Sequence, residues 1–190
     1  MRYRIEPVTP QNRQKACGLH VALGQEGFIE TVHECLMEAA EVPCWRPVLL
    51  CLEETAVGFA MYGLWEDKPP RGRVWLDRLL IDARYQGQGL ATAFLPRLIR
   101  RIRKAYACGT LYLSVYPENR TAIRLYERFG FRPNGERDIH GEHVMVLEFE
   151  ESEPDKASAR ERKKQVEAQP HLSGGLYPRH GGPDPRRNGG

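Results

Sequence analysis

The stretch that decides the fold reads WLDRLLIDARYQGQGLATAFL, residues 75–95. An apolar run ends at Ile81, glycines stand at positions 87 and 89, and a helical spacing of apolar residues begins at Leu90. Glycine lets backbone N–H groups approach a ligand closely, and a helix N-terminus carries partial positive charge. The junction therefore predicts an anion site, with phosphate as the first candidate. A tight strand-to-helix turn without a ligand is the alternative.

Two common phosphate-binding loops do not fit this junction. The dinucleotide fingerprint G-x-G-x-x-G fails because its last position is Thr92, and a Walker loop fails because the stretch contains no lysine. A third kind of phosphate loop is needed.

Composition indicates a single globular domain. The chain has 190 residues, 41% of them hydrophobic and 28% charged, and its net charge of +3 gives no reason to expect a polyanionic partner. Its five cysteines are scattered without a C-x-x-C pair, so we expect neither disulfides nor a metal site. Because no stretch reads as a signal peptide or a membrane helix, we expect a cytoplasmic protein with no membrane partner.

Apolar periodicity predicts the order of the elements. We expect a strand at 3–8, helices at 12–20 and 28–40, a hairpin over 46–64, a strand at 74–81, a helix over 90–102, a strand at 111–115, a helix at 119–129 and a closing strand at 143–149. This order predicts an α/β fold, a mixed sheet with helices on both faces, as one domain over residues 1–150. Residues 151–190 are charged or rich in Gly, Pro and Arg, and we expect a flexible tail there.

Two segments carry a family resemblance. Arg84-x-x-Gly87-x-Gly89 matches a loop of the form (Arg/Gln)-x-x-Gly-x-(Gly/Ala), and LSVYPENRTAIRLYERFGF, residues 113–131, matches a second cofactor segment. Because both segments are present and follow one another in this order, the chain resembles the GNAT superfamily of acyl-CoA N-acyltransferases over residues 1–150. The resemblance implies a mostly antiparallel twisted sheet with splayed central strands. It also implies acetyl-CoA as co-substrate and no metal.

The resemblance suggests that the anion is the pyrophosphate of coenzyme A, held by main-chain N–H groups over 86–91. The strand before the loop would offer main-chain groups to the pantetheine arm. Arg84 would add a side-chain donor or stay solvated, and Asn119 would contact the cofactor or only cap the next helix. The expected cofactor-binding residues are Leu79, Leu80, Ile81, Arg84, Gln86, Gly87, Gln88, Gly89, Leu90, Ala91, Asn119 and Tyr126.

The chemistry of amine acetylation calls for an acid and a base. The resemblance implies that Tyr126 protonates the departing thiolate, and a packed core tyrosine is the alternative. An alkyl ammonium must also lose a proton before it can attack the thioester. Asp77 and Glu26 are the candidates for the base, although Asp77 could instead pair with Arg78 or Arg84.

An acidic series precedes and follows the start of the second predicted helix. Glu26, Glu30, Glu34 and Glu38 recur every four residues, which indicates either a solvated helix face or an acidic wall for a polycationic substrate. The segments GQEGFIETVHECLMEAAEVPCWRPV, AIRLYERFGF and GEHVMVLEF resemble the bacterial spermine/spermidine (diamine) N-acetyltransferases within the superfamily. The resemblance implies direct acetyl transfer to a polyamine amine, with substrate contacts from Glu26, Glu30, Glu34 and Asp77.

Other functions stay open from sequence. A protein or peptide acetyltransferase, acting on lysine or an N-terminal amine, would use the same cofactor loop. A non-catalytic module binding CoA or nucleic acid is the other alternative, because basic residues gather between Arg97 and Lys104. The near absence of aromatic residues there argues against nucleic acid. A homodimer is compatible with the sequence.

Overall fold

The architecture comes from a computed structural model that describes residues 1–65 and 72–149. Within these residues, seven strands form one sheet: β1 (Tyr3–Pro7), β2 (Trp45–Leu52), β3 (Thr55–Trp65), β4 (Arg73–Ile81), β5 (Thr110–Val115), β6 (Arg132–Arg137) and β7 (His143–Glu148). The described helices are α1 (Arg13–Cys17), α2 (Val32–Glu41), α3 (Leu90–Tyr106) and α4 (Arg120–Arg128), with a 3-10 turn at Ala83–Tyr85. The segment predicted as a flexible tail lies outside the described residues.

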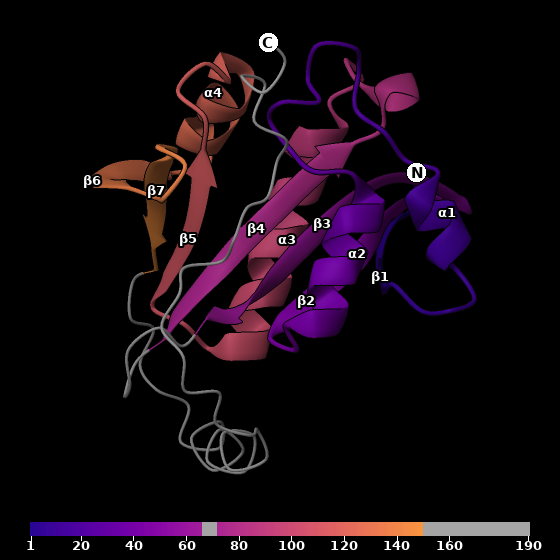
Figure 1. The fold of residues 1–190 in the computed structure, drawn as a ribbon, viewed down its shortest axis with the longest axis horizontal. Coiled ribbons are helices and arrows are strands. Elements are labelled where there is room, and N and C mark those ends of the chain that lie inside the picture. Colours follow the sequence, from indigo (N-terminus) through magenta and orange to yellow (C-terminus); the bar gives the residue numbers. More distant parts are fainter. Residues whose placement is uncertain (66–71, 150–190) are drawn as a thin grey trace, which may run out of the picture.

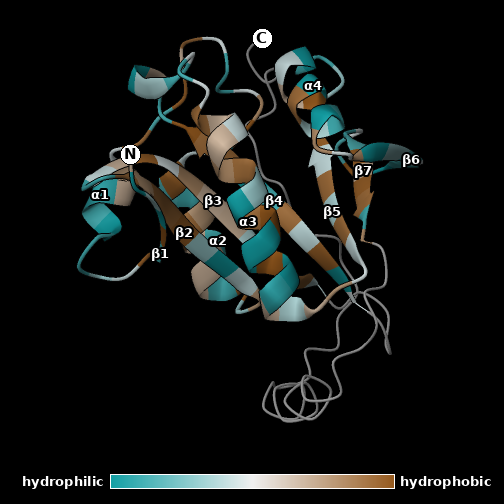
Figure 2. Ribbon diagram, turned by 180° about the vertical axis from the view of Figure 1, so that it is seen from behind, coloured by the Kyte–Doolittle hydropathy of each residue, from teal (hydrophilic) through white to brown (hydrophobic). Residues whose placement is uncertain are grey.

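The sheet order is β1-β2-β3-β4-β5-β7-β6, and the pairing is antiparallel except between β4 and β5 (Figure 1). Helices cover both faces: α1 and α2 pack on one core, α3 and α4 on the other, as the opposite views in Figures 1 and 2 show. The apolar row predicted for α3 is buried, because Phe94, Leu98 and Ile102 are fully enclosed. The predicted mixed, mostly antiparallel fold is confirmed.

The central strands splay apart as expected. Parallel pairing joins β4 to β5 only at Val74–Leu111 and Trp75–Tyr112, at the beginning of both strands. From there the two strands diverge toward their C-terminal ends (Figure 1). The main-chain groups of β4 that face β5 are therefore not used in that pairing over Leu79–Ile81, where a peptide-like ligand could hydrogen-bond to them.

The second predicted helix begins later than the apolar spacing indicated. Helix α2 starts at Val32 rather than near residue 28, because Thr31 forms a capping box with Glu34. The Thr31 hydroxyl accepts a hydrogen bond from the Glu34 amide, and the Glu34 carboxylate accepts one from the Thr31 amide. The chain before Thr31 is a loop, so Glu26 and Glu30 do not belong to the helix. The first predicted helix is also shorter, ending at Cys17.

A β-bulge interrupts the pairing of β3 with β4. Met61 pairs with Arg78 and Tyr62 with Leu76, so Asp77 is the extra residue on β4. The side chains of Asp77 and Arg78 consequently do not point to opposite faces. Their charged atoms lie 2.6 Å apart.

Candidate functional site

The glycine loop has the geometry of an anion cradle. Gly87 and Gly89 adopt φ values of +74° and +73°, a left-handed conformation that favours glycine. No heavy atom lies within 4 Å of the position that a Cβ would occupy on either glycine, so the space beside the loop is open. Helix α3 begins at Leu90, and the first amides of a helix have no partner within it. These amides and the positive end of a 17-residue helix favour a bound anion.

The Arg84 side chain is engaged within the protein. Its Nε and Nη2 atoms donate to the two carboxylate oxygens of Asp82, at 2.7 and 3.0 Å. Asp82 is completely buried, and although burial alone would raise its pKa, hydrogen bonds from Arg84 and from the His20 amide hold the pKa near 2. This geometry favours a positioning role for the Arg84 side chain over direct contact with a phosphate.

The segment before α2 docks on the same loop. The Gln86 side chain donates to the Gln25 side chain at 2.9 Å and to the Ile81 carbonyl at 3.0 Å, and the Ala83 amide donates to the His20 carbonyl at 2.8 Å. The loop predicted to hold the cofactor and the segment that leads to the acidic helix are therefore built against each other.

Tyr126 lies on α4, and Asn119 is the residue that caps this helix. Asn119 accepts a hydrogen bond from the Ala122 amide at 3.2 Å, so the capping alternative is observed. Tyr126 is 9% exposed, and its ring packs edge-on against Phe131 with centroids 5.8 Å apart. Burial, and secondarily the negative charge of Glu142, raise the pKa of the Tyr126 phenol above its usual range. The phenol is consequently protonated at neutral pH and available as a proton donor.

Buried charges gather on the α2 side of the sheet. The Arg78 side chain is only 5% exposed, and carboxylate oxygens of Asp77, Glu30 and Glu38 lie 2.6, 2.7 and 3.5 Å from its nitrogens. We call these residues together with Glu142 the acidic cluster. Asp77 was an expected base, and the structure realises the alternative that it pairs with Arg78.

Titration of the acidic cluster is strongly perturbed. Burial raises the pKa of Asp77 to about 7 against the opposing effect of Arg78. Burial likewise raises the pKa of Glu142 to about 7, although a hydrogen bond from Ser114 opposes the shift. The acidic cluster contains four carboxylates and a single guanidinium, so it carries an excess of negative charge whenever it is mostly ionised.

The predicted acidic row does not form one wall. Glu30 and Glu38 reach Arg78, whereas Glu34 is exposed and bonds to Thr31 through the capping box. Glu26 is exposed, and its carboxylate accepts a hydrogen bond from the Gly24 amide at 2.7 Å. The capping box turns Glu34 toward Thr31, and the late start of α2 leaves Glu26 in the loop before the helix.

Glu142 and two aromatic residues were not among the expected site residues. The Phe28 ring, from the segment before α2, lies 6.1 Å from the Tyr116 ring, which follows β5. Tyr116 and Ser114 both hydrogen-bond to the Glu142 side chain. The only sequence signal for Glu142 is an acidic residue at the edge of an apolar strand, which is too common to single out.

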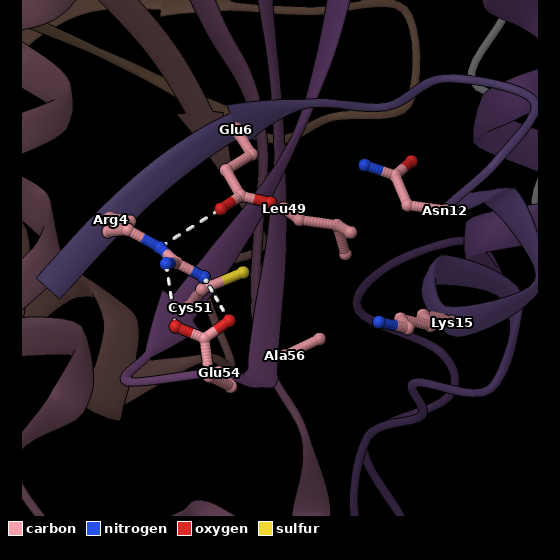
Figure 3. A pocket seen from close by; sticks show the side chains of 8 residues that line it. All are labelled: Arg4, Glu6, Asn12, Lys15, Leu49, Cys51, Glu54 and Ala56. Carbon is pink, nitrogen blue, oxygen red and sulfur yellow. Dashed lines mark hydrogen bonds and ion pairs between the residues drawn. The ribbon is translucent and has the colours of Figure 1, made fainter.

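A separate cavity lies at the β1–β2 edge of the sheet. It measures about 250 Å³ and contains none of the expected site residues (Figure 3). Arg4 spans it, pairing with Glu6 at 3.0 Å and Glu54 at 2.8 Å. Both carboxylates of the cavity are thus already paired with Arg4. Among the described residues, no group of His, Cys, Asp and Glu side chains is arranged to hold a metal ion. No described helix is long and apolar enough to cross a membrane.

Comparison with known proteins gives one consistent result. The family model described as acetyltransferase (GNAT) family matches residues 14–131. A spermine/spermidine N(1)-acetyltransferase from Bacillus subtilis is 47% identical over 152 residues, covering 78% of this chain and 100% of that protein.

Solved structures agree on the fold. A spermidine N-acetyltransferase from Vibrio cholerae in complex with CoA and spermine has a TM-score of 0.60 at 16% identity, over 77% of this chain and 95% of that chain. The PaiA N-acetyltransferase from Thermoplasma acidophilum in complex with coenzyme A has a TM-score of 0.60 at 13% identity, over 78% of this chain and 100% of that chain. By its glycine loop, its splayed sheet and these matches, the chain belongs to the acetyltransferase (GNAT) family.

Proposed function

We propose that the protein transfers the acetyl group of acetyl-CoA directly to a primary amine of a polyamine. The observation that carries the acceptor class is the acidic cluster, in which three carboxylates pair with the Arg78 guanidinium and the buried Glu142 lies within electrostatic range of it. An excess of enclosed negative charge favours ligands with several ammonium groups. The names of the Bacillus and Vibrio relatives support the same substrate class.

Acetyl-CoA would lie between the two halves of the site. The amides around Gly87 and Gly89 would bind its pyrophosphate, and main-chain groups of Leu79 and Ile81 would bind the pantetheine arm beside the diverging strands. This arrangement would bring the thioester near the C-terminal ends of β4 and β5. Tyr126 on α4 and Glu142, the residue before β7, would lie in the same region. Tyr126 would then protonate the sulfur as the C–S bond breaks.

The acceptor would bind from the α2 side of the sheet. One ammonium of the polyamine would approach the thioester, and the others would lie against the acidic cluster, with Phe28 and Tyr116 contacting the methylene chain. No side chain needs to form a covalent acetyl intermediate in this scheme. The homodimer and the cytoplasmic location stay predictions from the sequence.

Thiol release from acetyl-CoA tests the proposal. The full-length protein is assayed with spermine, spermidine, putrescine and a lysine peptide at equal concentrations. Turnover with polyamines and not with the peptide is expected. Turnover with the peptide alone would refute the polyamine proposal in favour of a protein acetyltransferase.

Two variants test the acceptor site. Glu30→Gln removes a carboxylate from Arg78 and is expected to raise the KM for spermidine about tenfold, because one charge contact is lost. Glu41→Gln, at the exposed end of α2, is the matched control and should leave the KM unchanged. Equal KM values for the two variants would show that the acidic cluster does not bind the substrate.

A further inference from the structure

The four carboxylates of the acidic cluster are not equivalent. Asp77, Glu30 and Glu38 all lie within ion-pair distance of Arg78, at 2.6, 2.7 and 3.5 Å. Burial raises the pKa of Asp77 to about 7, as it does that of Glu142, but Asp77, Glu30 and Glu38 are all engaged in ion pairs with Arg78. Glu142 has different contacts, since the hydroxyls of Ser114 and Tyr116 hydrogen-bond to its side chain. A hydroxyl group can donate a hydrogen bond to the ionised carboxylate and accept one from the protonated carboxyl group. These partners therefore permit Glu142 to gain and lose a proton.

Backbone hydrogen bonds hold Glu142 at the opening of the sheet. The Glu142 amide donates to the Asp138 carboxylate at 2.9 Å, and the Glu142 carbonyl accepts from the Asp138 amide at 3.1 Å. In the β5–β7 register Val115 pairs with His143, so Glu142 comes just beyond this pair, beside Tyr116. This is the end of β5 that diverges from β4.

Glu142 is also close to both halves of the reaction. Its charge contributes to the raised pKa of Tyr126, the proposed acid, and to that of Asp77 in the acidic cluster. Glu142 therefore lies near the region where the thioester sulfur and the acceptor nitrogen would meet. Glu142 is only 8% exposed, so its carboxyl group is largely shielded from bulk water.

We infer that Glu142 is the base that removes a proton from the substrate ammonium, while Asp77, Glu30 and Glu38 with Arg78 bind and orient the acceptor. This inference rests on the proposed acetyl transfer to polyamines. It assigns to Glu142 the role for which Asp77 and Glu26 were the candidates from sequence.

The acceptor nitrogen loses two protons during the reaction. One proton of the ammonium passes to the Glu142 carboxylate, and the freed lone pair of nitrogen forms a bond with the thioester carbonyl carbon. The tetrahedral intermediate collapses, the C–S bond breaks, and the thiolate takes the Tyr126 proton. The second proton lost by nitrogen restores Tyr126, and the proton on Glu142 returns to water. The net reaction releases one proton, the N-acetyl amine and coenzyme A.

Several charged or titratable groups face Glu142 and affect its titration. They come from the loop before α2, from β4, from the end of β5, from α4 and from the β6–β7 turn: Glu30, Asp77, Arg78, Tyr116, Tyr126 and Asp138. With these neighbours its pKa is about 7, raised chiefly by burial. A base with this pKa is ionised above neutral pH, so the rate should fall on the acid side of it.

The test is the pH dependence of kcat/KM for spermidine, measured by thiol release between about pH 6 and pH 9. The wild-type profile should fall below a midpoint near 7, as the carboxyl group of Glu142 takes up a proton. Glu142→Gln should reduce kcat about 100-fold at neutral pH, and the deficit should shrink as rising pH supplies free amine. Affinity for acetyl-CoA should not change.

Three further variants control the experiment. Glu148→Gln changes an exposed carboxylate at the end of β7, the strand that Glu142 precedes, and should match wild type. Asp77→Asn should raise the KM for spermidine yet retain the acidic limb. Glu142→Asp, which keeps a carboxylate, should lower kcat but preserve an acidic limb, and it gives the decisive readout if the Gln variant does not fold.

The outcomes separate the two proposals. Wild-type turnover with a Glu142→Gln rate within about threefold of wild type would overturn the assignment of Glu142 alone. Loss of the acidic limb in Asp77→Asn but not in the Glu142 variants would instead make Asp77 the base. A wild type that acetylates none of the amines would refute the proposed function, and this inference with it.

Discussion

Replacing Tyr126 with phenylalanine tests the other proton transfer. The substitution removes one oxygen and leaves the ring in its edge-on contact with Phe131, where the centroids are 5.8 Å apart. The core around α4 should therefore keep its packing, and the free energy of unfolding should change by no more than about 1 kcal/mol. Any large loss of activity would then come from chemistry rather than from unfolding.

The size of the loss follows from the leaving group. A positioned general acid contributes roughly 10²–10⁴-fold, but a thiol with a pKa near 8.5 leaves more readily than an alkoxide or an amine. We therefore expect the lower end, about 100-fold in kcat, equivalent to about 2.7 kcal/mol of activation free energy. Because burial raises the pKa of Tyr126 above its usual range, the phenol stays protonated, and its titration should not limit the wild-type rate below about pH 9.

The assay combines thiol release at saturating spermidine with calorimetric binding of acetyl-CoA. Tyr106→Phe is the matched control, because Tyr106 is partly buried against the Tyr62 ring, with centroids 6.3 Å apart, at the far end of α3. The Tyr126 variant should lose turnover and keep cofactor affinity, while the control keeps both. A Tyr126→Phe turnover within about threefold of wild type would refute its role as the acid.

Three other substitutions test the loop, the acidic cluster and the helix start. Gly89→Ala should weaken coenzyme A binding at least about tenfold by calorimetry, because its Cβ enters the open space beside the loop, whereas Gly135→Ala carries similar backbone strain at +85° and should not. Arg78→Gln should lower the free energy of unfolding in urea by about 3–5 kcal/mol, and by more at high pH than at low pH, since protonation relieves unpaired carboxylates. An equal loss at both pH values would contradict this explanation. Thr31→Ala should cost about 1 kcal/mol through loss of the capping box, and an unchanged melting temperature would contradict that.

The glycine turn of the candidate cofactor site was predictable because its signals are local. Two glycines between an apolar strand and an amphipathic helix require a backbone that only glycine adopts easily, and both have positive φ. The order of strands and helices likewise follows from periodicity over short windows. The local pattern did not show that the Arg84 side chain binds Asp82 instead of a phosphate. Asp82 is buried at a junction that also includes the distant His20 amide, and sequence spacing does not show such a contact.

The acceptor half was only partly predictable because it is assembled from distant segments. Equal spacing of Glu26, Glu30, Glu34 and Glu38 indicated one helical face, but the Thr31 capping box divides the series between a loop and a helix. Glu142 enters from the far end of the chain through the β5–β7 pairing. Sequence spacing contains no information about such contacts, since they depend on which strands become neighbours.

The β-bulge explains how one strand can serve both halves of the proposed site. In a regular strand alternate side chains share a face, so Arg78 would lie with Leu76 in the apolar core beneath α3. The extra residue at Asp77 shifts this alternation, and Leu80 consequently packs in the core beneath α2 instead. Arg78 shifts with it and meets the carboxylates of Glu30 and Glu38 rather than being buried without a partner, which would cost several kcal/mol. A strand with unbroken alternation could not build the acidic cluster.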